Sequence, residues 1–120
     1  MNPENKNFVL AMIDKSPVSV RTLDDATLYH MELPDGRPLA ICADVTTLDS
    51  SFAVIYYTIS VGDDIIEEAI VDTSKKKIDP VAKDIIQIMR ACSTKVMMQE
   101  AHLTHSKFMV HLVSNNKTMS

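Results

Sequence analysis

Phe52-Ala53-Val54-Ile55-Tyr56-Tyr57-Thr58-Ile59-Ser60 is the longest stretch of this sequence that is almost wholly apolar, β-branched or aromatic. It contains three of the six aromatic side chains and no charge. Such residues favour strands, and a strand that is apolar on both faces does not belong at a wet edge. The stretch therefore predicts a strand at the centre of a sheet, covered on both faces by this chain or sealed on one face by a partner.

The sequence before this stretch predicts a hairpin over 26–45. Its turn, Pro34-Asp35-Gly36-Arg37, has proline and glycine where tight turns need a fixed φ and a positive φ. Beyond the turn, every second residue of 39–45 is apolar, as in a strand with one buried face. A shorter strand is expected at 18–22, and a polar connector at 46–51 leads into the apolar stretch.

The sequence after the stretch predicts one more strand. Val61-Gly62-Asp63-Asp64 has the composition of a second tight turn, and 65–71 is again rich in β-branched residues. Strands joined by short turns pair antiparallel with their neighbours. The sequence therefore predicts a four- or five-stranded antiparallel meander.

Both ends of the chain carry apolar residues at helical spacing. A short helix is expected over 3–15, where Pro3 suits the first turn. Asp79-Pro80 has the sequence of an N-cap and a first helical residue, which predicts a helix from Pro80 to about Gln99. The apolar stripe of this second helix consists of Val81, Ile85, Ile88, Met89, Cys92 and Val96.

The segment 101–113 fits two patterns. Phe108, Val110 and Leu112 alternate as in a strand, whereas Leu103, Phe108 and Leu112 nearly continue a helical stripe. A second helix is the favoured interpretation. The expected fold class is α+β, a single domain over 1–120 in which a short N-terminal helix, the meander and a C-terminal helical segment pack as two layers.

The composition is typical of a soluble protein. With 120 residues, of which 46% are apolar and 23% charged, the chain can bury one core without metal or disulfide staples. No run approaches the roughly 20 apolar residues of a membrane helix, and the first residues do not resemble a signal peptide. Cys42 and Cys92 form no CxxC pattern and are expected to be buried, reduced thiols. A cytoplasmic location without membrane association is expected.

Charge is segregated along the chain. Residues 38–74 contain seven acidic side chains and no Lys or Arg, whereas 75–120 contains eight basic and three acidic side chains. An acidic sheet and a basic helical segment can steer a complementary partner, or bring two copies together. The alternative is that both are ordinary solvated surfaces.

Catalytic and metal-binding patterns are weak. Glu67 and Glu68 are adjacent on a predicted strand, so they point to opposite faces and cannot work as an acid–base pair. His102 and His105 would share a helical face, but two histidines without a third ligand are usually surface residues. The chain has no Gly-rich phosphate loop and no nucleophile elbow. We therefore expect no enzyme, no metal and no cofactor.

Methionine is unusually frequent, with eight residues in the chain. Met97 and Met98 are consecutive, so on a helix they point about 100° apart and widen its apolar arc beyond what one sheet face needs. Methionine is common in adaptable binding surfaces as well as in irregular cores. If both helices pack on one face of the sheet, a second copy or a target protein is expected to cover the other face.

The expected function is a non-catalytic protein-binding module, such as an inhibitor, adaptor or secretion-chaperone-like protein, that occludes a partner surface and forms a homodimer. One alternative is a nucleic-acid-associated regulatory protein that uses the basic C-terminal segment, which the pI near 5.4 disfavours. A second alternative is a small enzyme of unknown reaction. The residues expected to contact the protein partner are Tyr56, Tyr57, Asp63, Asp64, Glu67, Glu68, Met97 and Met98.

Overall fold

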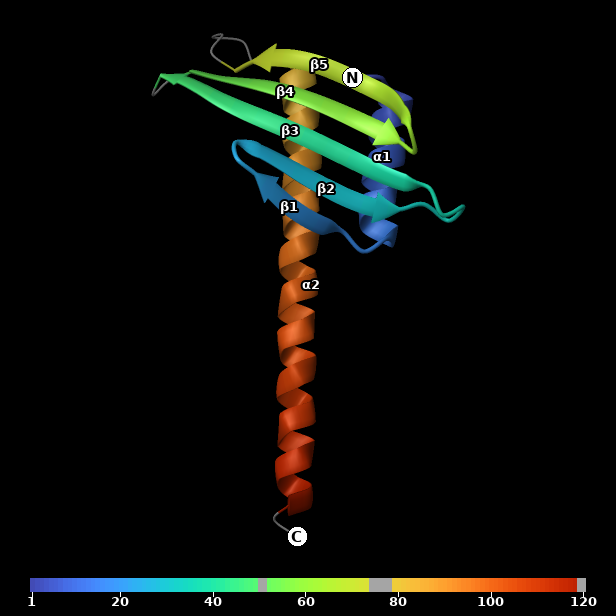
Figure 1. Cartoon of the computed structure of the whole chain (residues 1–120), viewed down its shortest axis with the longest axis vertical. Helices are drawn as coiled ribbons and strands as arrows, with labels where there is room; N and C mark the ends of the chain where they lie inside the picture. Colours follow the sequence, from blue (N-terminus) through green and yellow to red (C-terminus); the bar gives the residue numbers. More distant parts are fainter. Residues whose placement is uncertain (50–51, 74–78, 119–120) are drawn as a thin grey trace.

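A computed structural model describes residues 1–49, 52–73 and 79–118 of the chain (Figure 1). A helix, five strands and a long second helix follow one another, which confirms the α+β class. The elements are α1 (Pro3–Lys15), β1 (Ser19–Leu23), β2 (Ala26–Glu32), β3 (Pro38–Asp49), β4 (Phe52–Val61), β5 (Asp64–Asp72) and α2 (Pro80–Thr118).

The strands form one antiparallel meander in the order β1-β2-β3-β4-β5. Gly36 and Gly62 adopt φ of 88° and 60° in the two turns that were predicted around them. The central strand is β3 and not β4, so the prediction that 52–60 occupies the centre is wrong by one strand. Only β5 follows β4, whereas β1 and β2 both precede β3.

The strand β3 is longer than its hydrophobic pattern indicated. It continues to Asp49, so the predicted connector is wrong over 46–49. Thr46 and Thr47 are β-branched and extend the pairing of β3 with β4 before the register shifts. The rest of that connector, 50–51, and the linker predicted at 75–77 lie outside the described residues.

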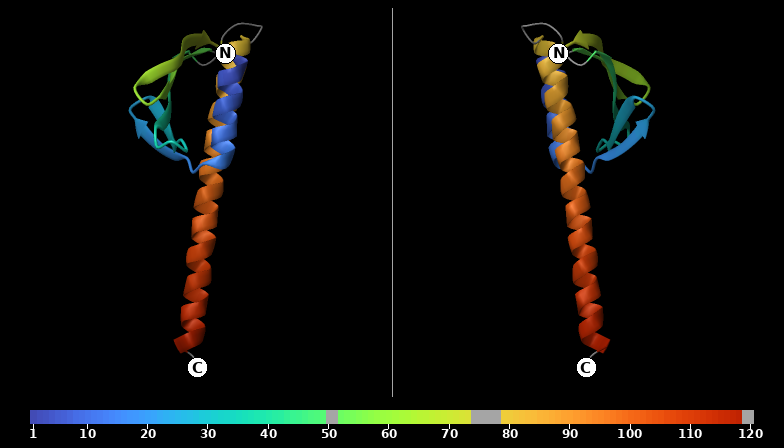
Figure 2. Two further views of the ribbon diagram at one scale, coloured as in Figure 1. Left: turned by 90° about the vertical axis from the view of Figure 1, so that its right-hand side faces the viewer. Right: turned by 90° about the vertical axis from the view of Figure 1, so that its left-hand side faces the viewer.

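Both helices pack on the same face of the sheet, here called the inner face (Figure 2). Ile55, Tyr57 and Ile59 of β4 are buried on this face. The helix α1 begins where the side chain of Asn2 accepts a hydrogen bond of 2.9 Å from the backbone N–H of Glu4. The helices contribute a buried stripe that consists of Val9, Met12, Ile13, Ala82, Ile85, Ile88 and Cys92.

No described element covers the opposite face of the sheet, here called the outer face (Figure 2). The sequence predicted that the apolar strand is covered on both faces by this chain or sealed on one face by a partner. For the residues that the structure describes, the first of these predictions is wrong. The reason is that the chain supplies two helices, and these pair with each other along the inner face. The Lys6 ammonium group lies 2.8 Å from the Asp84 carboxylate, which joins α1 to α2.

The second helix, α2, is continuous over 39 residues. The prediction of a separate helix over 101–113 is wrong, because this segment is part of α2. Pro80 is the only proline in α2 and the helix contains no glycine, so nothing in its interior breaks it. The first half, 80–99, lies under the sheet, whereas the projecting half, 100–118, extends away from it (Figures 1 and 2). The radius of gyration is accordingly 18.3 Å, against about 14 Å for a compact chain of this length.

Gln99 marks the point where α2 leaves the sheet. Its amide nitrogen donates a hydrogen bond to the carbonyl of Val18, and its amide oxygen accepts one from the N–H of Val18, both at 2.7 Å. The side-chain amide therefore pairs with the backbone as a neighbouring strand would. One turn earlier, Lys95 donates a hydrogen bond of 2.8 Å to the carbonyl of Asp14 at the end of α1.

Candidate functional site

The outer face of the sheet carries large apolar side chains that are open to solvent. Leu23 of β1, Tyr56 of β4, and Ile65 and Ile70 of β5 are between 41% and 70% exposed. Tyr56 lies opposite Ile70 in the β4–β5 register, so these two side chains are neighbours on this face. Single exposed apolar residues are normal, but several on one sheet face form a surface that a partner can cover.

Acidic groups lie among these apolar side chains. The hydroxyl of Tyr56 donates a hydrogen bond to a carboxylate oxygen of Glu68, and this bond is the main cause of the raised pKa of Tyr56. Asp44 lies opposite Tyr56 in the β3–β4 register. One of its carboxylate oxygens is buried and has no hydrogen-bond partner among the described residues. Around Tyr56 the outer face is therefore both apolar and acidic.

Glu67 and Glu68 point to opposite faces, as predicted. On the α1 side of the sheet, Glu67 accepts hydrogen bonds of 3.0 Å from the backbone N–H of Asn2 and from the side-chain amide of Asn5. Glu67 therefore joins β5 to the start of α1, which is a structural role. Glu68, on the outer face, remains exposed.

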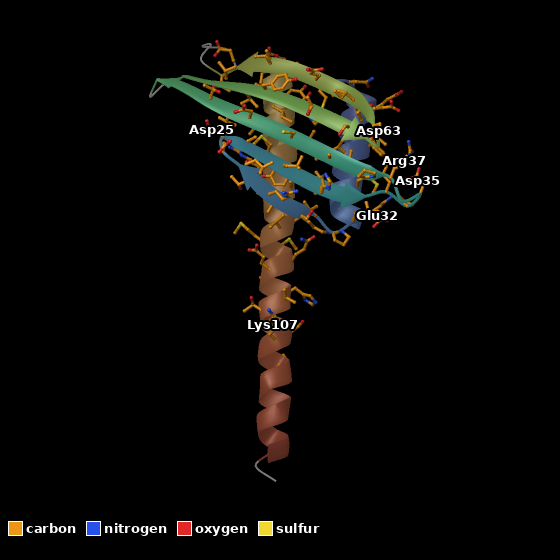
Figure 3. The ribbon with its side chains drawn as sticks, viewed as in Figure 1. Asp25, Glu32, Asp35, Arg37, Asp63 and Lys107 are labelled. Carbon is orange, nitrogen blue, oxygen red and sulfur yellow. The ribbon has the colours of Figure 1, made fainter. Side chains whose placement is uncertain are left out.

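The other predicted contact residues are spread over the molecule. Asp63 and Asp64 are exposed at the β4–β5 turn, at the opposite end of the strands from Asp25 (Figure 3). Tyr57 is fully buried in the core, where burial raises the pKa of its phenol. Of the eight predicted contact residues, the outer face brings together only Tyr56 and Glu68. Ile65 and Ile70 were missed, although their exposure follows from their alternation with Ile66 and Val71 along β5.

Met97 and Met98 lie on α2 just before it leaves the sheet, and they are 69% and 64% exposed. Their backbone positions differ by about 100° around the helix, as expected. Met98 lies beside Leu10 and Ile13 of α1. Met97 lies on another side of α2, where it borders an open groove.

This groove, here called the α2 groove, lies between α2 and the inner face of the sheet. It has a volume of about 470 Å³ and is lined by Tyr29, Ile55, Ile86, Met89, Arg90, Ser93, Thr94 and Met97. The hydroxyls of Tyr29 and Ser93 form a hydrogen bond of 2.8 Å in its wall. Asp84, which accepts a hydrogen bond from Lys6, faces α1. Ser93 follows Asp84 by nine residues, or two and a half helical turns, so the two residues lie on opposite sides of α2. The α2 groove is therefore on the side of α2 opposite to α1.

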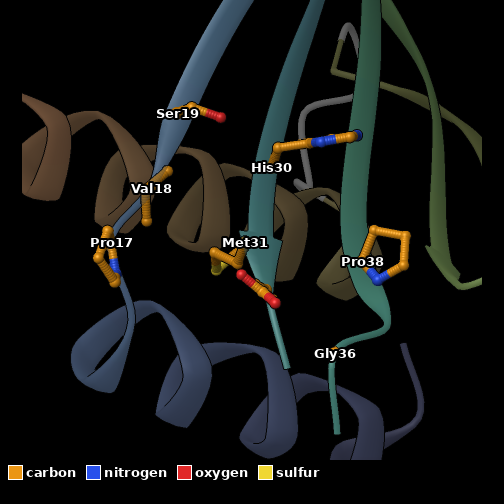
Figure 4. A pocket seen from close by; sticks show the side chains of 8 residues that line it. Pro17, Val18, Ser19, His30, Met31, Gly36 and Pro38 are labelled. Atoms are coloured by element: carbon orange, nitrogen blue, oxygen red, sulfur yellow. The ribbon is translucent and has the colours of Figure 1, made fainter. Parts of the chain in front are cut away.

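A second cavity of about 480 Å³ lies near the start of β1 and includes three residues with chemically active side chains, Ser19, His30 and Glu32. Ser19 lies opposite His30 in the β1–β2 register. His30 points toward β3 and away from Ser19 (Figure 4). A serine nucleophile is activated by a base within hydrogen-bond reach. No such bond joins these three side chains in the described structure, so their arrangement supports no assignment of catalytic roles.

Metal ligands do not cluster in the described residues. Among the residues that the structure describes, no three His, Cys, Asp or Glu side chains lie close enough together to hold a metal ion. Cys92 is fully buried beneath the sheet, and burial raises the pKa of its thiol to about 12. Among residues 1–49, 52–73 and 79–118, no helix has both the length and the apolar content for a membrane crossing.

Comparisons with known proteins give no further assignment. No protein-family model matches the chain, and the searches of curated proteins and of solved structures return no match.

Proposed function

We propose that this protein is a non-catalytic protein-binding module that occludes a surface of its partner with the outer face of its sheet. The observation that carries the proposal is the set of exposed apolar residues on a face that no described element of the chain covers, namely Leu23, Tyr56, Ile65 and Ile70. Apolar area removed from water contributes about 25 cal/mol per Å², so covering this face would favour association.

The charge of the same region defines the chemistry of the partner. Residues 38–74, which supply β3, β4 and β5, contain no basic side chain. Glu68 and Asp44 lie within the outer face. A complementary partner carries apolar side chains together with Lys or Arg, because opposite charges speed the encounter and fix the register of the two surfaces. The cytoplasmic location expected from the first residues of the sequence is part of the proposal.

Affinity capture from the native cell with matched variants tests this proposal. In Ile70→Glu a charge replaces an exposed apolar residue of the outer face, and in Glu68→Lys the local charge is reversed. Leu103→Glu, on the projecting half of α2, is the matched control because Leu103 is also more than half exposed. We expect the two outer-face variants to bind the captured protein at least tenfold more weakly and the control to bind it as the natural chain does.

Two results would contradict the proposal. One is a captured protein that all three variants bind equally. The other is a salt-sensitive gel shift with nucleic acid, without any protein partner, which would favour the nucleic-acid alternative.

A further inference from the structure

Most described side chains of the projecting half of α2 are open to solvent, and its first turn, at Glu100 and Leu103, borders the start of β1. From Ala101 to His105 every side chain is exposed, and the large apolar residues Leu103 and Met109 are 56% and 46% exposed. Twelve of the residues in 100–118 are His, Ser, Thr, Asn, Val or Phe, which are weaker helix formers than Ala, Leu or Lys. An isolated helix of about this length and composition is marginal in water. A surface that packs against the projecting half would therefore add to its stability.

The apolar stripes of the covered half continue into the projecting half. On the side that faces the sheet, Cys92 and Val96 are followed at helical spacing by Leu103. On the side that faces the α2 groove, Met97 is followed by Ala101. The projecting half thus begins with apolar residues on both sides that a helix buries when it lies in a corner between a sheet and another helix.

The molecule itself contains such a corner. The α2 groove is bounded by the inner face of the sheet on one side and by α2 on another, and α1 occupies only the opposite side of α2. Its lining residues Ile55, Ile86 and Met89 are apolar. The covered half, 80–99, and the projecting half, 100–118, are each about 30 Å long at 1.5 Å per residue. A helix the length of the projecting half therefore fits alongside the covered half.

We propose that the occupant of the α2 groove is a second copy of this chain, in a two-fold dimer whose α2 helices pair antiparallel. The two-fold axis passes near Gln99 and Glu100, so that the projecting half of each copy lies beside the covered half of the other. The exposed projecting half and the open groove belong to the same chain, so one symmetric contact covers both projecting halves and fills both grooves, which favours this occupant. This dimer uses a surface different from the outer face and does not depend on the proposed function.

Sedimentation equilibrium of the full chain tests the dimer. We expect a dimer for the natural chain, and a dissociation constant at least 100-fold higher for Met97→Glu and for Leu103→Glu. Both residues are exposed in a single copy, so the substitutions leave the fold of the monomer intact, which circular dichroism checks. Ile70→Glu, with 70% exposure on the outer face, is the matched control and remains dimeric. A natural chain that is monomeric at 100 μM, or a dimer that only Ile70→Glu dissociates, would overturn the proposal.

Spin-label distances test the orientation. A label is attached to Lys83→Cys or to Lys107→Cys in a Cys42→Ser background, while Cys92 is shielded by its burial. Lys107 lies on the projecting half (Figure 3), and Lys83 is exposed on the covered half. The antiparallel dimer predicts intermolecular distances of about 50 Å at position 83 and about 25 Å at position 107. Short and equal distances at both positions would indicate a parallel pair and overturn the proposal. Ile70→Glu tests partner binding by the outer face, whereas Leu103→Glu tests the dimer. The proposed function and the proposed dimer can therefore fail independently of each other.

Discussion

Tyr56 and Tyr57 are identical, consecutive side chains with opposite environments. Tyr57 faces the helices on the inner face and is fully buried, whereas Tyr56 is 41% exposed on the outer face and donates a hydrogen bond to Glu68. Glu67 and Glu68 differ in the same way, since one is bonded to α1 and the other lies on the open face. Residue type alone therefore does not separate core from surface in this sheet. The position of the two helices does.

The two cysteines also lie on opposite faces of the sheet, and the difference in their thiol reactivity is the largest effect that we expect. Cys92 lies beneath the inner face, where burial raises the pKa of its thiol from 9.0 to about 12. The thiolate is the reactive form, so its concentration at pH 8 falls about a thousandfold. Cys42 belongs to the outer face and is half-buried. With iodoacetamide at pH 8 we expect Cys42 to react fully before Cys92 reacts measurably, as followed by mass spectrometry of the peptides. Equal rates would show that the inner face opens readily.

Removal of each tyrosine ring measures how much the two faces of the sheet contribute to stability. Tyr57→Ala leaves a large cavity between the sheet and the helices, and we expect it to lower the free energy of unfolding by about 3–5 kcal/mol. Tyr56→Ala, the matched control on the other face, is expected to leave the stability nearly unchanged. Urea denaturation followed by circular dichroism measures both values. Similar losses in the two variants would mean that something covers the outer face in solution.

The Lys6–Asp84 contact between α1 and α2 is expected to contribute the smallest of these effects on stability, and its contribution depends on pH. The ammonium group of Lys6 donates a hydrogen bond to Asp84 and holds the pKa of this carboxyl below its ordinary value of 3.8. Because the folded-state pKa is lowered, the stabilisation is present above the unfolded-state pKa and is lost as the pH falls through the folded-state pKa.

Asp84→Asn is therefore expected to be slightly less stable than the natural chain at pH 7. The difference should disappear below the ordinary carboxyl range. Thermal unfolding at a series of pH values measures it, with Asp63→Asn on the exposed turn as the control. A difference that persists at low pH would mean that packing, and not the charge of Asp84, joins the helices.

The local elements could be predicted because their signals are local. Turn glycines at 36 and 62, alternation along the strands and the Asp79-Pro80 start of α2 depend on a few neighbouring residues, and the structure has elements at each of these places. The length of α2 was harder to predict. Its C-terminal half carries both a helical and an alternating pattern, and only the lack of an interior proline or glycine indicates a single helix. The joining of Gln99 to Val18, 81 positions away in sequence, has no local signal.

The candidate surfaces were predicted less well than the fold. Glu68, Tyr56, Met97 and Met98 are exposed, but Tyr57 is in the core and Glu67 is bound to α1. Alternation fixes that neighbours on a strand point to opposite faces. It does not say which face the helices cover, because both faces of β4 carry apolar or β-branched residues.

Short-range patterns in the sequence predict that this chain forms a helix, an antiparallel meander and a C-terminal helix, because φ preferences and side-chain periodicity act over short distances. That α1 and α2 lie together on one face of the sheet follows from long-range packing and has no such pattern. That choice depends on contacts such as Lys6 with Asp84, between residues far apart in the chain. As a result, the outer face stays open and the projecting half of α2 extends beyond the sheet, and these are the two surfaces from which both proposals arise.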